Sequence, residues 1–160
     1  MSDILWAPWR HAYVSSSIDN RDKKCVFCDE RSELWLFSTE KVRVYLNKFP
    51  YNNGHLLVAP IRHVSDISEL SREEFHALWD EVMRCKSILQ QLMSPDGFNI
   101  GMNLGRVSGA GIDQHIHVHI VPRWNGDTNF MPVISDTKVI SQSLEELKRL
   151  LCEKLSCGKA

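Results

Sequence analysis

Three histidines alternate with apolar residues in the segment His115-Ile116-His117-Val118-His119-Ile120-Val121. Successive side chains of a strand point to opposite faces, so this spacing predicts a strand over residues 115–121 with three imidazoles on one face. Neutral imidazole is a nucleophile and a proton carrier near pH 7, and it is also a zinc ligand. The spacing alone favours neither histidine-based catalysis nor metal binding.

A glycine-rich segment precedes the histidines, Gly105-Arg106-Val107-Ser108-Gly109-Ala110-Gly111. Glycine permits positive φ and a close approach of the backbone, so such a loop can aim several N–H groups at one anion. A metallohydrolase would also want carboxylate ligands, and Asp113 is the only one near the histidines in the sequence. The two segments together favour attack on a phosphate by a histidine nucleophile.

Two cysteines form a Cys-x2-Cys pair in Cys25-Val26-Phe27-Cys28. Paired thiolates at this spacing supply half of a tetrahedral zinc shell. A redox motif would need a thioredoxin-like strand and helix around it, and the sequence predicts none. We interpret the pair as half of a structural zinc site with histidines as the other ligands; two incidental thiols are the alternative.

Several predicted elements would position these residues. Two strands, Val42–Leu46 and His55–Pro60, flank a turn-rich segment and indicate an antiparallel pair. A capping box at Ser71 and Glu74 begins a long amphipathic helix that ends near Ser94. A third strand is expected over residues 98–103 and a last helix over residues 143–156, whereas residues 124–140 match no regular pattern. Strands followed by helices predict an α+β fold with an antiparallel sheet, one long helix and a C-terminal helix.

Composition limits the classes of function. The chain has 160 residues, of which 43% are hydrophobic and 24% charged, and its formal net charge is −1. One domain is expected, over residues 1–160, and no large positive field exists to hold nucleic acid. No stretch approaches the roughly 18 apolar residues of a membrane span. Five cysteines, with no secretion signal at the N-terminus, favour reduced thiols in the cytoplasm.

The pattern His-x-His-x-His followed by apolar residues resembles the histidine triad family of nucleotide hydrolases and transferases. The segment Asn47–Pro60 is similar to the same family, with an asparagine, a proline and a Gly-His pair before an apolar strand. Downstream, Pro122–Trp124, Gly126-Asp127 and Asn129–Pro132 resemble its bacterial diadenosine tetraphosphate phosphorylase and hydrolase branch. The likeness follows the chain in order over about residues 5–135. Within the single domain we expect an N-terminal arm (1–22), a core (23–123) and a loop with the C-terminal helix (124–160).

The resemblance implies roles for individual residues. His117 would attack the α-phosphorus and form a nucleotidyl-histidine intermediate, His119 would contact the α-phosphate, and His55 would lie beside the triad as a fourth histidine. Asn47 would reach the ribose hydroxyls, and Asn103 the phosphate or bridging region. Backbone donors to the phosphates would come from Ser108, Gly109, Ala110 and Gly111.

Some members of the superfamily carry a zinc bound by two cysteines, a histidine in a Pro-x-x-His segment and the first triad histidine. Pro60-Ile61-Arg62-His63 matches that segment here. The resemblance therefore implies a structural zinc on Cys25, Cys28, His63 and His115, with no open position for chemistry and no organic cofactor.

The resemblance also implies an enzyme that cleaves dinucleoside polyphosphates such as diadenosine tetraphosphate, and a homodimer. If inorganic phosphate resolves the intermediate, the products are ATP and ADP; if water does, the enzyme is a hydrolase. The segment from Trp124 to Pro132 favours the phosphorylase. A nucleoside phosphoramidase, a zinc-dependent hydrolase with the triad as ligands, and a non-catalytic nucleotide-binding module are the alternatives.

Overall fold

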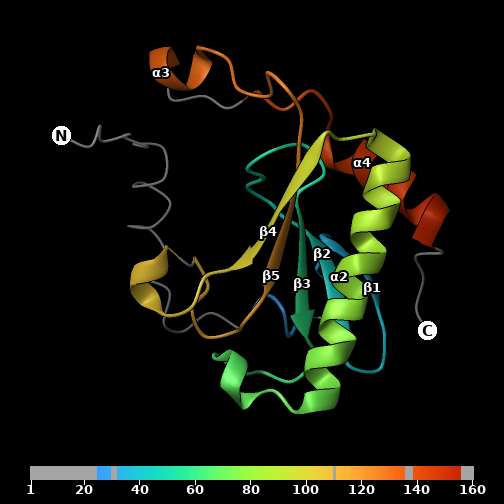
Figure 1. Cartoon of the computed structure of the whole chain (residues 1–160), viewed down its shortest axis with the longest axis vertical. Helices are drawn as coiled ribbons and strands as arrows, with labels where there is room; N and C mark the ends of the chain where they lie inside the picture. The colour runs from blue at the N-terminus through green and yellow to red at the C-terminus, as the bar shows by residue number, and fades with distance from the viewer. Residues whose placement is uncertain (1–24, 30–31, 110, 136–138, 156–160) are drawn as a thin grey trace.

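The strands form a single antiparallel sheet in the computed structural model, which describes residues 25–29, 32–109, 111–135 and 139–155. Its strand order is β1-β2-β3-β5-β4, so β5 lies between β3 and β4 (Figure 1). The interior position of β5 places the triad next to the strand that follows His55. The strands are β1 (Trp35–Ser38), β2 (Val42–Leu46), β3 (Leu56–Pro60), β4 (Gly97–Met102) and β5 (Val118–Arg123).

The long helix α2 (Arg72–Met93) begins where the capping box predicts. Ser71 Oγ accepts a hydrogen bond from the Glu74 N–H at 3.2 Å, and Glu74 Oε2 accepts one from the Ser71 N–H at 2.8 Å. These two bonds satisfy N–H groups that a helix N-terminus leaves without partners. Among the described residues, no helix combines the length and apolar character that crossing a membrane requires.

The C-terminal helix α4 (Leu144–Leu155) begins after Ser143, whose Oγ accepts from the Glu146 N–H at 3.2 Å. Shorter elements complete the described part of the chain: the 3-10 helices Ile67–Glu69 and Arg106–Ser108, and α3 (Met131–Ser135).

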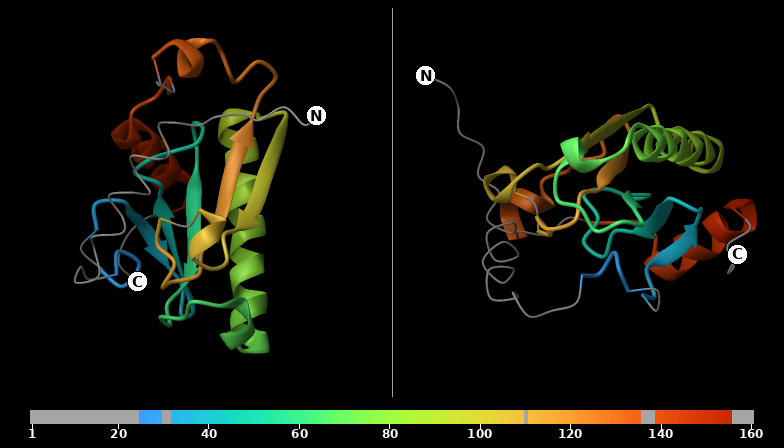
Figure 2. Two further views of the ribbon diagram at one scale, coloured as in Figure 1. Left: turned by 90° about the vertical axis from the view of Figure 1, so that its left-hand side faces the viewer. Right: turned by 90° about the horizontal axis from the view of Figure 1, so that it is seen from below.

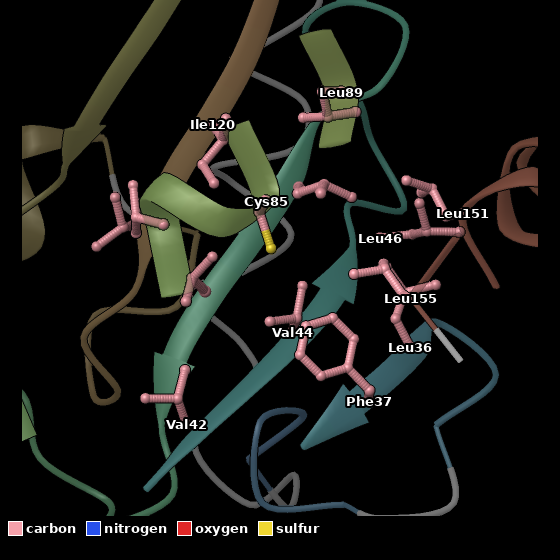
Figure 3. Close-up of a cluster of buried hydrophobic side chains, with 14 of the residues drawn as sticks. Leu36, Phe37, Val42, Val44, Leu46, Cys85, Leu89, Ile120, Leu151 and Leu155 are labelled. Carbon is pink, nitrogen blue, oxygen red and sulfur yellow. The ribbon is translucent and has the colours of Figure 1, made fainter. Parts of the chain in front are cut away.

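The register of the strands separates two faces of the sheet. Val44, Val58 and Val118 lie opposite one another and belong to the large core that α2 and α4 cover. Figure 3 shows side chains of both helices, such as Cys85 and Leu151, meeting the strands in this core. Figure 2 shows α2 behind the strands in its left view, so the helices cover one face of the sheet.

The next row, Tyr45, Leu57 and His119, points to the opposite face. Tyr45 and Leu57 pack there with Phe27 in a second, smaller cluster. One face of the sheet therefore packs against the helices in the large core, and the histidines lie on the opposite face.

The α+β fold class is confirmed, as are the predicted strands at β2, β3 and β4 and both predicted helices. The strand expected over residues 115–121 begins later, at Val118. The backbone N–H of Ile116 donates to the carbonyl oxygen of Val64 at 2.7 Å, so the backbone of Ile116 bonds to the segment after β3 and not to a neighbouring strand. Ile116 is still buried, and the alternation of imidazole and apolar side chains persists.

The elements that were not predicted include β1 and α3. β1 is short and its sequence, Trp-Leu-Phe-Ser, has no alternation of polar and apolar residues. The unassigned segment 124–140 contains α3. The predicted N-terminal arm, residues 1–22, lies outside the described residues.

Gly54 occupies a position that only glycine fits. Its φ is +76°, and an added Cβ would lie 2.8 Å from Met93 Sδ and 3.0 Å from Pro122 Cγ. We expect Gly54→Ala to lower the free energy of unfolding by about 2 kcal/mol, from strained backbone and overpacking combined. Chemical denaturation measures this. Gly97→Ala is the control, because a Cβ at Gly97 meets no atom within 4 Å; equal effects of the two substitutions would contradict this explanation.

Candidate functional site

His117 lies just before β5, on the face of the sheet opposite the helices, and is buried. Its Nδ1 is 2.9 Å from the backbone carbonyl oxygen of His115. Because a carbonyl oxygen can only accept, Nδ1 carries the ring proton and Nε2 keeps its lone pair. The backbone therefore holds His117 in the tautomer that presents a nucleophile at Nε2.

A second pair of imidazoles lies beside His117. His55 Nε2 is 2.9 Å from His119 Nδ1, and the centroids of the His117 and His119 rings are 4.8 Å apart. His55 precedes β3 and His119 lies in β5, so neighbouring strands bring them together. The structure thus places the three histidines predicted to be catalytic in one group.

Two donors determine the tautomer of His55. Its Nδ1 accepts a hydrogen bond from the backbone N–H of Tyr51 at 3.0 Å and another from the side-chain amide Nδ2 of Asn47 at 3.2 Å. Nδ1 must accept from both, so the proton of neutral His55 is on Nε2, where it is donated to His119 Nδ1. His119 then carries its own proton on Nε2. His117 and His119 consequently offer complementary groups, a lone pair and an N–H donor.

Burial keeps the His55 and His117 rings uncharged at neutral pH. It lowers the pKa of His55 to about 3, with smaller contributions from the charges of His119 and His117. It also lowers the pKa of His117, against the opposing effect of the hydrogen bond to His115. Because the pKa values of His55 and His117 are lowered, both imidazoles are neutral at pH 7, and a nucleophilic imidazole must be neutral.

The low pKa of His55 predicts that acid destabilises the fold. The unfolded chain binds a proton at His55 near pH 6.5, whereas the folded chain does so only near pH 3. Between these values the unfolded state binds more protons, so stability falls as the pH decreases. From pH 8 to pH 5 we expect His55 alone to remove about 2 kcal/mol.

Denaturant unfolding of His55→Asn at the two pH values measures this contribution. The variant should lose about 2 kcal/mol less than the wild type between pH 8 and pH 5. The exposed His76, substituted in the same way, is the matched control and should leave the difference unchanged. Identical pH dependence of His55→Asn and the wild type would contradict the burial argument.

A separate cluster gathers Cys25, Cys28, His63 and His115, whose ligand atoms all lie within 4.8 Å of one another. Among the described residues, it is the one group of three or more cysteine, histidine, aspartate or glutamate side chains that could hold a metal ion. The turn 25–28, the segment after β3 and the start of the triad segment contribute the four side chains. The structure therefore brings together all four predicted metal ligands.

The distances in the cluster suit a tetrahedral ion. Cys25 Sγ is 3.3 Å from His115 Nδ1, and Cys28 Sγ is 3.3 Å from His63 Nδ1 and 3.6 Å from His115 Nδ1. Zinc at its usual bond lengths separates sulfur and nitrogen ligands by about 3.6 Å. His115 Nε2 donates to the Pro60 carbonyl oxygen at 2.9 Å, which leaves Nδ1 as the ligand atom.

Electrostatics in the cluster also favour a cation. Burial lowers the pKa of His115 to about 4, so its ring is neutral and able to ligate. Burial raises the pKa of the Cys25 thiol above its ordinary value, so a cation is what would hold it as a thiolate. The donor set fits a structural zinc with its four positions filled by protein.

The predicted phosphate-binding residues come from two segments, the residue after β4 and the glycine-rich loop. Asn103 follows β4, whose last residue pairs with Val118 beside His117. The glycine-rich loop contains a 3-10 turn, and Gly105 and Gly109 have φ of 76° and 84°. Ser108 is exposed and donates its hydroxyl to the Gly105 carbonyl oxygen at 2.6 Å. Gly111 is half-buried, and Ala110 lies outside the described residues.

Two aromatic residues of the site were not predicted to take part in it. Tyr51 stacks on His119 with ring centroids 5.6 Å apart, and Phe27 lies against His117 with centroids 4.7 Å apart. Each comes from a segment noticed for another reason, the loop before His55 and the cysteine pair. No periodicity marks either ring, because both reach the site from turns.

Comparisons with known proteins find a matching family model and similar sequences. The HIT domain family model matches residues 29–126. The AP-4-A phosphorylase of Mycobacterium tuberculosis is 36% identical over 158 residues, which cover 92% of this chain and 81% of the relative. The bis(5'-adenosyl)-triphosphatase of Dictyostelium discoideum is 34% identical over 93 residues, covering 58% of this chain and 61% of the relative.

Solved structures share the fold. A hypothetical histidine triad nucleotide-binding protein of Sulfolobus tokodaii superposes with a TM-score of 0.68 at 26% identity, covering 82% of this chain and 92% of that one. A zinc-bound histidine triad family protein of Mycobacterium smegmatis gives a TM-score of 0.66 at 26% identity, covering 88% and 95%.

Proposed function

We infer the function of this chain from one premise, that it belongs to the HIT domain family. We propose that it is an enzyme that cleaves dinucleoside polyphosphates through a nucleotidyl group on His117. Similarity to an AP-4-A phosphorylase and to a bis(5'-adenosyl)-triphosphatase supports this substrate class. The observation that carries the proposal is the hydrogen bond from His117 Nδ1 to the His115 carbonyl oxygen, which leaves the Nε2 lone pair for attack.

In the first step, His117 Nε2 attacks the α-phosphorus of diadenosine tetraphosphate. The N–P bond forms, the P–O bond to the leaving group breaks, and ATP departs from adenylyl-His117. His119, with its proton on Nε2, donates a hydrogen bond to the phosphate oxygens, while His55 holds His119 in that tautomer. Asn47, Asn103 and the backbone of residues 108–111 are the proposed contacts to ribose and phosphates.

In the second step, inorganic phosphate attacks the same phosphorus from the opposite side of the N–P bond. ADP is released and His117 regains its lone pair, so diadenosine tetraphosphate and phosphate give ATP and ADP. The alignment to the AP-4-A phosphorylase covers 92% of this chain, whereas the alignment to the bis(5'-adenosyl)-triphosphatase covers 58%. The more extensive similarity to the phosphorylase supports phosphate as the acceptor. Cytoplasmic location and homodimeric assembly complete the proposal.

Product analysis tests the acceptor. We expect diadenosine tetraphosphate in phosphate buffer to yield ATP and ADP, and omission of phosphate to slow turnover strongly. ATP and AMP in the presence of phosphate would exclude phosphorolysis and leave the hydrolase. Turnover of adenosine phosphoramidate that equals or exceeds turnover of the dinucleotide would favour the phosphoramidase instead.

The metal cluster is proposed to hold a structural zinc. His115 is the one triad residue among its ligands, and the cluster contains neither His117 nor His119. The zinc would tie the turn 25–28 to the triad segment, and four protein ligands would leave it no position for substrate. This distribution of ligands argues against a zinc-dependent hydrolase.

A further inference from the structure

We propose that Phe27, the residue before the second cysteine of the metal cluster, is a positioning residue for His117. The proposal rests on His117 being the nucleophile, as argued above. It assigns the turn 25–28 a second task besides metal binding: its aromatic side chain sets the plane of the attacking imidazole.

The backbone of Phe27 is anchored to the sheet independently of any metal. Its carbonyl oxygen accepts from Arg43 Nη1 at 3.0 Å and from the Tyr45 hydroxyl at 2.9 Å. Both donors are buried residues of β2. The sheet therefore determines where the turn, and with it the Phe27 side chain, is placed.

The Phe27 ring lies among three other rings and is 1% exposed. Its centroid is 4.7 Å from that of His117, with the planes inclined by 36°. It meets His115 and Tyr45 edge to face, each at 5.3 Å. Phe27 thus contacts the residue whose ring joins the metal cluster and the residue whose ring attacks.

One hydrogen bond is not enough to orient an imidazole. The bond from His117 Nδ1 to the His115 carbonyl oxygen fixes one atom, and the ring can still pivot about it. A flat ring packed against one face restricts that pivot. In-line attack needs the Nε2 lone pair aimed at phosphorus, and misplacement by about 1 Å can cost about 100-fold in rate. Packing by Phe27 adds a restraint that the hydrogen bond lacks, beside the contact with the His119 ring, whose centroid lies 4.8 Å from that of His117.

The adjacent residue offers a matched control. Val26 lies in the same turn between the same two cysteines, but its side chain is 49% exposed and takes no part in the cluster around Phe27. Val26→Ala changes the same turn at an exposed side chain. A difference between substitutions at 26 and 27 therefore reports the contact with His117 and not the presence of a substitution near the metal ligands.

The experiment compares Phe27→Ala, Phe27→Leu and Val26→Ala with the wild type as purified holoproteins. Metal content, thermal midpoint, kcat, KM and the single-turnover rate of adenylyl-enzyme formation are measured for each. We expect Phe27→Ala to lower kcat and the single-turnover rate about 10- to 100-fold, with KM changed less than about twofold and metal retained. Leucine refills apolar volume without a flat face, so Phe27→Leu should recover the thermal midpoint more fully than the rate.

Several results would overturn the proposal. One is a wild-type single-turnover rate in either Phe27 variant, and another is an equal loss in Val26→Ala. Loss of metal or of folding in both Phe27 variants would make Phe27 a residue of the folded core with no separate positioning task. Failure of the proposed function looks different, because the wild type and Val26→Ala would then form no adenylyl-enzyme at all.

Discussion

Replacing His117 with glycine is expected to lower turnover of diadenosine tetraphosphate at least about 10⁴-fold, because the variant lacks the atom that we propose forms the N–P bond. Nucleotide affinity should change little, since the other proposed contacts to ribose and phosphates remain. Steady-state kinetics and equilibrium binding of a non-hydrolysable dinucleotide measure the two quantities. Mass spectrometry of acid-quenched wild type should find an adenylyl group on His117, and the variant should carry none.

The exposed His76 on α2 supplies the control, and His76→Ala should keep wild-type turnover. Substantial turnover in His117→Gly would eliminate this residue as the nucleophile. Loss of binding together with turnover would instead give His117 a role in holding substrate. The hydrogen-bond chain from Tyr51 through His55 to His119 adds a finer expectation, namely that His55 variants remain partly active because His55 forms no bond to phosphorus.

Replacing Cys28 with serine is expected to abolish tight metal binding and to destabilise the protein by several kcal/mol. Cys28 Sγ lies within 3.6 Å of the ligand nitrogens of both histidines in the cluster. Its loss therefore removes one of the four ligands at a position next to both imidazoles. The remaining ligands come from separate segments that the ion would hold together. Metal analysis of the purified protein and thermal unfolding, with and without a chelator, measure both effects.

Cys152 is the matched control, because it is a free cysteine on α4 and belongs to no cluster of candidate ligands in the described residues. Cys152→Ser should keep its metal and respond to a chelator as the wild type does. A metal-free wild type with an unchanged thermal midpoint would contradict the structural role of the ion.

Much of the site was predictable because its residues lie in patterns that depend on local geometry. Alternation of His117 and His119 with apolar residues indicated one common face, and that face is retained although His117 precedes the strand. The capping box at Ser71 and Glu74 placed the start of α2 because it depends on bonds within one turn. Membership of Cys25 in the cluster was expected from spacing and the family resemblance together.

Other features depend on contacts between distant parts of the chain, which spacing does not encode. β5 begins at Val118 because Ile116 bonds to Val64, and nothing in the sequence near residue 116 signals that partner. Phe27 reaches His117 across 90 positions of the chain, and a single aromatic residue in a turn has no periodicity. Tertiary packing decided both cases.

His115 contributes its ring to the metal cluster and its carbonyl oxygen to the hydrogen bond of His117, the proposed nucleophile. One practical consequence concerns how preparations are compared. Without the proposed zinc, the peptide that carries this carbonyl group would lose one of its restraints, so the rate of turnover should depend on the fraction of protein molecules that hold the ion. Turnover rates divided by the amount of bound zinc should agree between protein batches grown with different amounts of zinc in the medium. Turnover rates divided by the mass of protein should instead differ between those batches.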